Sequence, residues 1–164
     1  MGYCIVCFLP VLPQPSIRQT ELTSHFLFIY TAIGVEAEQK LLTNMIFTSK
    51  EKAAIVHVAT TMQLIDNDMD DKETLLNTMV FIKIGVDGSD INLSKKTSTL
   101  EAIITIANMT KDEKTFVCSF LAALIAIDGK IEKEEVKFWQ LISKLCNFPT
   151  MSLQDAIKKF SEYV

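Results

Sequence analysis

Five carboxylates crowd one short stretch of the chain, and they are the residues best suited to bind an ion. They are Asp66, Asp68, Asp70, Asp71 and Glu73. Hard divalent cations such as Ca²⁺ and Mg²⁺ prefer oxygen ligands, so this cluster favours a site for one of them. The spacing is not that of an EF-hand, because the sixth position counted from Asp66 is Asp71 rather than glycine and the twelfth is Asn77. We therefore expect a shallow site with weak affinity.

The same acids also have a purely structural explanation. Asp70 followed three residues later by Glu73 forms a capping box, in which each side chain satisfies a backbone N–H at a helix start. Acids in the first turn also complement the helix dipole, and Asp66 can simply mark the turn. From the sequence alone, capping and cation binding both remain open.

A second acidic corner lies 62 positions downstream of the first. Asp66 and Glu73 correspond there to Asp128 and Glu135, while Asp68 corresponds to Lys130. A lysine at this position places a positive charge where the first corner has a carboxylate. The sequence therefore predicts cation binding mainly at the first corner, with Asp128 and Glu135 as the counterparts in the second.

Each corner connects two predicted helices. Apolar residues recur at helical spacing on both sides of it, and a hydroxyl followed three residues later by an acid marks four helix starts. These starts are Thr48, Ser98, Thr110 and Ser152. The pattern predicts an all-α helical bundle of two pseudo-repeated three-helix units, related by an approximate twofold axis. The first two helices of the units are 62 positions apart, and the third helices, which start at Ser98 and Ser152, are 54 positions apart.

Three details of the first unit follow from the same pattern. The first helix is expected to end at Asp66, and Val86 to Ser94 is predicted to be a polar turn. The short third helix of this unit is predicted to bury four apolar residues, which are Leu100, Ile103, Ile104 and Ala107.

The helix after the second corner contains the only tryptophan of the chain. Phe138, Leu141 and Ile142 form its predicted buried stripe, and Trp139 lies one position off it. Trp139 is therefore either a partly exposed anchor for a protein partner or a side chain packed beneath a neighbouring helix or the N-terminal segment.

The first 44 residues differ from the rest of the chain. They hold three of the four prolines and few charges. We expect a helical domain over residues 45–164 and an N-terminal extension over residues 1–44, either partly disordered or resulting from an upstream start codon. If the extension is native, its apolar residues should pack on the bundle, because exposed apolar surface promotes aggregation. These are Phe26, Leu27, Ile29 and Tyr30.

Composition argues against several functional classes. A net charge of −4 without a basic stripe argues against nucleic-acid binding. No apolar run is long enough to span a membrane, and the N-terminus lacks the basic region of a secretory signal, so we expect a cytoplasmic protein. Its four cysteines do not suggest a disulfide framework or a zinc site.

Catalytic motifs are not identifiable either. His25 and His57 both lack the Glu-x-x-His pattern of di-iron bundles. Phosphate loops, dinucleotide-binding glycines and nucleophile triads are also not identifiable. The sequence predicts a non-enzymatic protein, a monomer or weak homodimer, with no cofactor other than a weakly held Ca²⁺ or Mg²⁺.

The second corner resembles the TerB-like family, named for a tellurite-resistance protein. That family is identified by an apolar helix, an Asp-Gly-x-Ile turn and a following Glu, which Asp128, Gly129, Ile131 and Glu135 match here. The resemblance covers residues 48–160 and implies an all-helical bundle, a role in stress and metal-oxyanion resistance, and acidic residues that bind a divalent metal. An alternative function is a protein–protein interaction adaptor that uses an exposed helical face, around Trp139.

Overall fold

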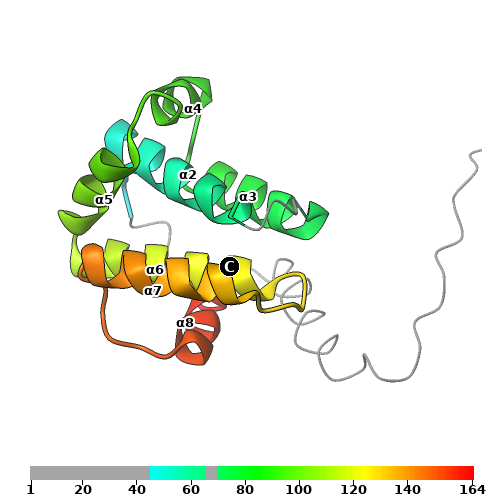
Figure 1. The fold of residues 1–164 in the computed structure, drawn as a ribbon. Coiled ribbons are helices and arrows are strands. Elements are labelled where there is room, and N and C mark those ends of the chain that lie inside the picture. The colour runs from blue at the N-terminus through cyan, green and yellow to red at the C-terminus, as the bar shows by residue number, and fades with distance from the viewer. Residues whose placement is uncertain (1–44, 66–69) are drawn as a thin grey trace, which may run out of the picture.

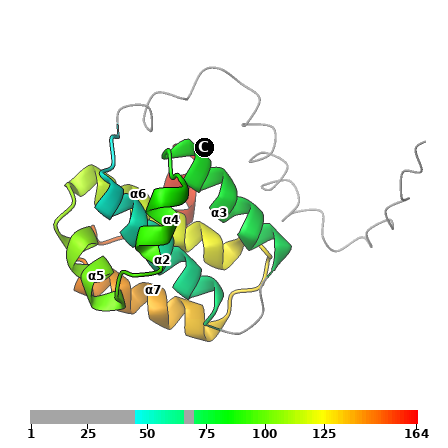
Figure 2. The same cartoon turned by 90° about the horizontal axis from the view of Figure 1, so that it is seen from above.

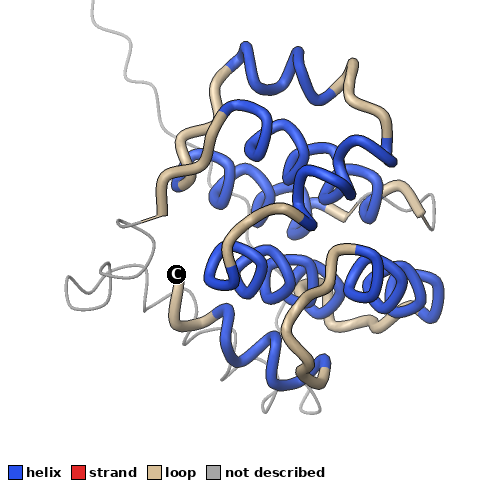
Figure 3. Tube along the Cα trace, turned by 90° about the vertical axis from the view of Figure 1, so that its left-hand side faces the viewer, coloured by secondary structure: helices blue, strands red, loops and turns tan. Residues whose placement is uncertain are grey.

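The fold is all helical, as predicted, in a computed structural model that describes residues 45–65 and 70–164. This part of the chain forms seven helices and no strand (Figures 1 and 3). The helices are α2 (Ser49–Gln63), α3 (Asp71–Lys83), α4 (Gly88–Ser94), α5 (Thr99–Ala107), α6 (Lys111–Ala126), α7 (Lys133–Leu145) and α8 (Leu153–Phe160).

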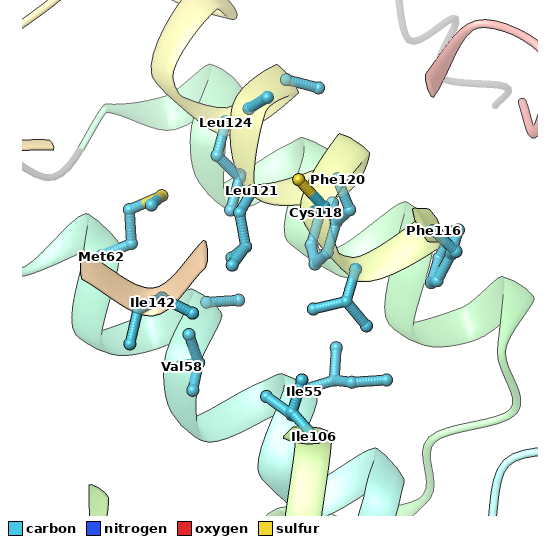
Figure 4. Close-up of a cluster of buried hydrophobic side chains, with 14 of the residues drawn as sticks. Ile55, Val58, Met62, Ile106, Phe116, Cys118, Phe120, Leu121, Leu124 and Ile142 are labelled. Carbon is cyan, nitrogen blue, oxygen red and sulfur yellow. The ribbon is translucent and has the colours of Figure 1, made fainter. Parts of the chain in front are cut away.

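Helix α6 is the centre of the core. Its residues from Phe116 to Ile125 are all buried, and α2, α3, α7 and α8 pack around it. The Phe116 ring lies 5.8 Å from Phe47, 6.2 Å from Phe120 and 5.3 Å from Tyr163, measured between ring centroids. Figure 4 shows part of this core, including Phe116 and Phe120, where side chains of α2, α5 and α7 meet α6. A helix that is apolar on every side is expected at such a central position.

The helix starts are confirmed at the predicted residues. Thr48, Ser98 and Thr110 each form a complete capping box with the glutamate three residues later. The Ser152 hydroxyl accepts a hydrogen bond from the N–H of Asp155 at the start of α8. These interactions are local, which explains why they can be recognised in the sequence.

The helices of the two hairpins start at matching positions at the predicted shift of 62. Helices α2 and α3 begin at Ser49 and Asp71, and α6 and α7 begin 62 positions later. Both hairpins end at a left-handed residue, Gly85 with φ 72° and Asn147 with φ 53°. Helix α5 then packs on α2, and α8 packs on α6. That the two halves superpose about a twofold axis stays a prediction.

Two expectations about local structure were wrong. Helix α2 ends at Gln63 with Leu64 as its C-cap, and not at Asp66. The stretch from Val86 to Ser94 is not a polar turn, because it contains α4. The Asp87 carboxylate starts this helix by accepting hydrogen bonds from the N–H groups of the second and third helical residues.

The predicted buried face of α5 was also wrong. Leu100 and Ile104 are 67% and 52% exposed, whereas Ala102 and Ile106 are fully buried. Ile103 and Ala107, also predicted to be buried, are of intermediate exposure. Most residues of this short helix are apolar, so the spacing alone cannot select the face that contacts the core.

Among the described residues, none of the helices combines the length and the apolar character needed to cross a bilayer. The predicted packing of Phe26, Leu27, Ile29 and Tyr30 concerns residues outside the described part of the chain.

Candidate functional site

The first acidic corner joins α2 to α3. Asp66 and Asp68 lie outside the described residues. Asp70 caps α3, with its Oδ1 accepting a hydrogen bond from the N–H of Lys72 at 2.7 Å. Glu73, in the first turn of α3, is only 5% exposed. The described part of this corner therefore contains three carboxylates, which are the capping Asp70, the exposed Asp71 and the buried Glu73.

The second corner joins α6 to α7. Asp128 Oδ1 accepts a hydrogen bond from the N–H of Lys130 at 2.8 Å, and Gly129 between them has φ 85°. Glu135 is 3% exposed, and its Oε2 accepts a hydrogen bond from the N–H of Glu132 at 3.3 Å. Both acids thus stabilise the turn and the start of α7.

The predicted metal ligands of the first corner lie only partly within the described part of the chain. Within residues 45–65 and 70–164, it brings together no group of three or more Asp, Glu, His or Cys side chains that could hold an ion. The predicted ligand set includes Asp66 and Asp68, which are outside these ranges. The cation site therefore stays a prediction.

Trp139 is not an exposed anchor, which corrects one of the two interpretations of this residue. It is 6% exposed, and its indole Nε1 donates a hydrogen bond to the backbone oxygen of Cys118 at 3.1 Å. The other interpretation, that it packs beneath a neighbouring helix, is confirmed, and that helix is α6. Phe138 is only partly buried, and Leu141, expected in the core, is 52% exposed.

Helix α7 does expose large apolar side chains, but at positions other than Trp139. Leu141 and Leu145 are 52% and 50% exposed and lie four residues apart, on one side of the helix. Leu100 and Ile104 form a similar exposed pair on α5. We call these four residues the α5–α7 face.

The two helices of this face are neighbours. Figures 1 and 2 both place α5 beside the C-terminal end of α7. The Cys146 thiol, at the end of α7, lies 3.7 Å from the backbone oxygen of Ile103 on α5. Each of these two residues is next in sequence to an exposed member of the face, Leu145 or Ile104, so these two members lie near the place where the helices meet.

Asp90 is a buried charge that the sequence analysis missed. It lies on α4, is 1% exposed, and its Oδ2 is 3.6 Å from the Nζ of Lys52 on α2. The Lys52 ammonium also donates a hydrogen bond to the backbone oxygen of Gly85 at 2.6 Å. The available signal was the capping box of Asp87 and Asp90, two acids three residues apart before an apolar residue.

His57 also holds α4 and α5 to α2. Its Nδ1 is 3.2 Å from the backbone oxygen of Ser94, so Nδ1 carries the proton and donates. Its Nε2 is 3.1 Å from the hydroxyl of Thr99. These contacts give His57 a structural role, because they link α2 to the end of α4 and the start of α5.

Comparison with solved structures gives an informative match. No family model matches the chain, and no curated protein matches it. A crystal structure of a protein of unknown function from Porphyromonas gingivalis is similar, with 31% sequence identity and a TM-score of 0.62. The match covers 71% of this chain and 91% of that chain.

Proposed function

We propose that this chain, which belongs to the same family as the Porphyromonas gingivalis protein, is a non-enzymatic binding module of the TerB-like kind. In this proposal it holds a protein partner on the α5–α7 face. On the basis of its resemblance to the TerB-like family, we propose that this module acts in stress and tellurite resistance. We also propose that it functions in the cytoplasm.

The single observation that supports this proposal is the exposure of the α5–α7 face. Two apolar residues spaced four apart on a helix are the usual contact pattern of helix-to-helix recognition. Fully burying a Leu or Ile side chain stabilises a complex by about 1.5–3 kcal/mol, so covering the exposed half of each contributes roughly 1 kcal/mol. Four such residues favour a partner held weakly and reversibly.

A paired pull-down experiment tests the α5–α7 face. The double variant Leu100→Asp with Leu141→Asp places two charges on this face and should lose partners that the wild type retains. Ile82→Asp is the matched control, because Ile82 is 73% exposed but lies on α3. Identical partner sets for the double variant and the wild type would refute the proposal. Sedimentation velocity of the purified proteins would reveal whether the partner is a second copy of this chain.

A second candidate function is weak binding of Ca²⁺ or Mg²⁺ at the first acidic corner. It is supported by the position of Asp70 and Glu73 at the start of α3, beside the segment that contains Asp66 and Asp68. Carboxylates so close together repel one another, and a divalent cation relieves this repulsion.

Amide chemical shifts during a Ca²⁺ or Mg²⁺ titration test this candidate. Localised, saturable shifts are expected around residues 66–73 at millimolar ion concentration, and they should disappear in Asp68→Asn. Asp128→Asn is the matched control, because it removes the corresponding type of charge from the second corner. Absence of localised shifts in the wild type would reject the cation site.

A further inference from the structure

A cavity of about 360 Å³ opens between the turn that joins α5 to α6 and the loop that joins α7 to α8. Its apolar walls are Met109 and Phe148, which are buried, and Pro149, which is partly buried. This volume lies within the range of small-molecule sites. The pocket is partly open to solvent, and polar groups make up more of its exposed lining than apolar ones.

Two lysines provide the charged lining of this cavity. Lys111 and Lys114 both lie in the first turn of α6 and line it, and no acidic residue does. Lys114 is partly buried, and its Nζ is held by a hydrogen bond to the backbone oxygen of Ala107 at 2.9 Å. The side chains of Asn147 and Thr150 add uncharged hydrogen-bonding groups. The cavity is therefore positively charged within a protein of net charge −4.

The nearest acids on α6 are directed elsewhere. The Glu113 carboxylate accepts hydrogen bonds from the N–H and the hydroxyl of Thr110, both at 2.8 Å. Asp112 is exposed at the start of α6 and is not among the residues that line the cavity. Neither acid lines the cavity, so the two lysines are not neutralised from within it.

We propose that this cavity binds a small organic anion. Its phosphate or carboxylate head would lie between Lys111 and Lys114, and its apolar body would pack against Met109 and Phe148. Lysine binds phosphate and carboxylate groups as a point charge, and its attraction strengthens where protein walls exclude water. This inference goes beyond the proposed function, because it requires neither the protein partner nor the cation.

Amide shifts of the ¹⁵N-labelled full-length protein test the inference with three probes. Phenyl phosphate and benzoate carry the two candidate heads on the same ring, and phenol carries the ring without the charge. We expect saturable shifts around Lys111, Lys114, Asn147 and Thr150 with at least one of the two anions. The anion that saturates at lower concentration identifies the head. Absence of saturable shifts with both anions, or equal shifts with phenol, would overturn the inference.

A matched pair of charge reversals sharpens the test. Lys111→Glu should weaken binding by at least about tenfold, because it replaces an attracting charge with a repelling one. Lys111 is exposed, so we expect the fold to be retained, and the circular dichroism spectrum checks this. Lys133→Glu makes the same change at the first residue of α7, away from the cavity, and should bind as the wild type does. Equal loss of binding in both variants would overturn the assignment to this cavity.

Discussion

The indole Nε1 of Trp139 donates a hydrogen bond to the backbone oxygen of Cys118 at 3.1 Å, and this bond links α7 to the central helix α6. Both residues are buried, with 6% and 1% of their surfaces exposed. A buried indole N–H needs an acceptor, because leaving it unpaired costs about 1–3 kcal/mol. Trp139 therefore anchors the packing of α7 on the core. Leu141 and Leu145 lie on the exposed side of the same helix.

Replacing Trp139 with phenylalanine should destabilise the protein by roughly 2 kcal/mol, because it removes this hydrogen bond and part of a buried ring. Urea denaturation followed by circular dichroism measures the change in the free energy of unfolding. Gln140→Ala, at the next and exposed position, is the control and should change it by less than about 0.5 kcal/mol. An unchanged midpoint for Trp139→Phe would show that the contact adds nothing to stability.

Replacing Lys52 with methionine should cost about 3 kcal/mol, because it leaves the Asp90 carboxylate buried without its cation. Lys50→Met is the control at an exposed position of the same helix and should have little effect. Adding Asp90→Asn to Lys52→Met should cost less than the sum of the two single changes. If the free-energy changes of Lys52→Met and Asp90→Asn simply added in the double variant, this would contradict a direct interaction between Lys52 and Asp90.

Gly85 and Gly88 should respond to alanine in opposite directions. Gly85 has φ 72°, where a side chain costs roughly 1–2 kcal/mol, although only Lys52 Nζ at 3.7 Å lies near the added carbon. Gly88 is the first residue of α4 and has open space, so alanine should stabilise the protein by up to about 1 kcal/mol. Thermal melts measure the melting temperatures of the two variants relative to the wild type. Shifts of the same sign for both variants would refute the prediction.

Cys118 and Cys146 should react slowly with thiol reagents in the folded protein. Burial raises the pKa of each thiol to about 11, so at about pH 8 both remain protonated and unreactive. Raising the pH towards the raised pKa should increase the rate, because the thiolate fraction grows. The measurement uses a Cys4→Ser, Cys7→Ser background and mass spectrometry, with urea-unfolded protein as the fast control. Equal rates in folded and unfolded protein would contradict the effect of burial.

Helix starts and the all-helical class could be predicted because they depend on neighbours in the sequence. The hydroxyl–glutamate pairs at Thr48, Ser98 and Thr110 are capping boxes in the structure, as the sequence indicated. Helix α4 was missed because the Asp87-Gly88 dipeptide also suits a turn and the helix has only seven residues. Its burial against α2 depends on Lys52, far away in the sequence.

The buried faces of the shorter helices were harder to predict for a different reason. On α7 the core face includes a carboxylate, Glu135, beside Trp139 and Ile142. A search for apolar residues alone therefore shifts the predicted stripe by one position, to Phe138 and Leu141. The cavity beside Lys111 combines two segments far apart in the sequence, residues 109–114 and 147–150, and spacing within one segment gives no indication of it.

Helix α4 packs mainly on α2, and the side chains of Lys52 and His57 hold it there. None of the seven residues of α4 belongs to the hydrophobic core cluster around α6. We therefore expect α4 to open as a unit while α6 stays folded, a subglobal opening of the kind that native-state hydrogen exchange detects. The amide protons of α4 should then exchange together and before those of α6.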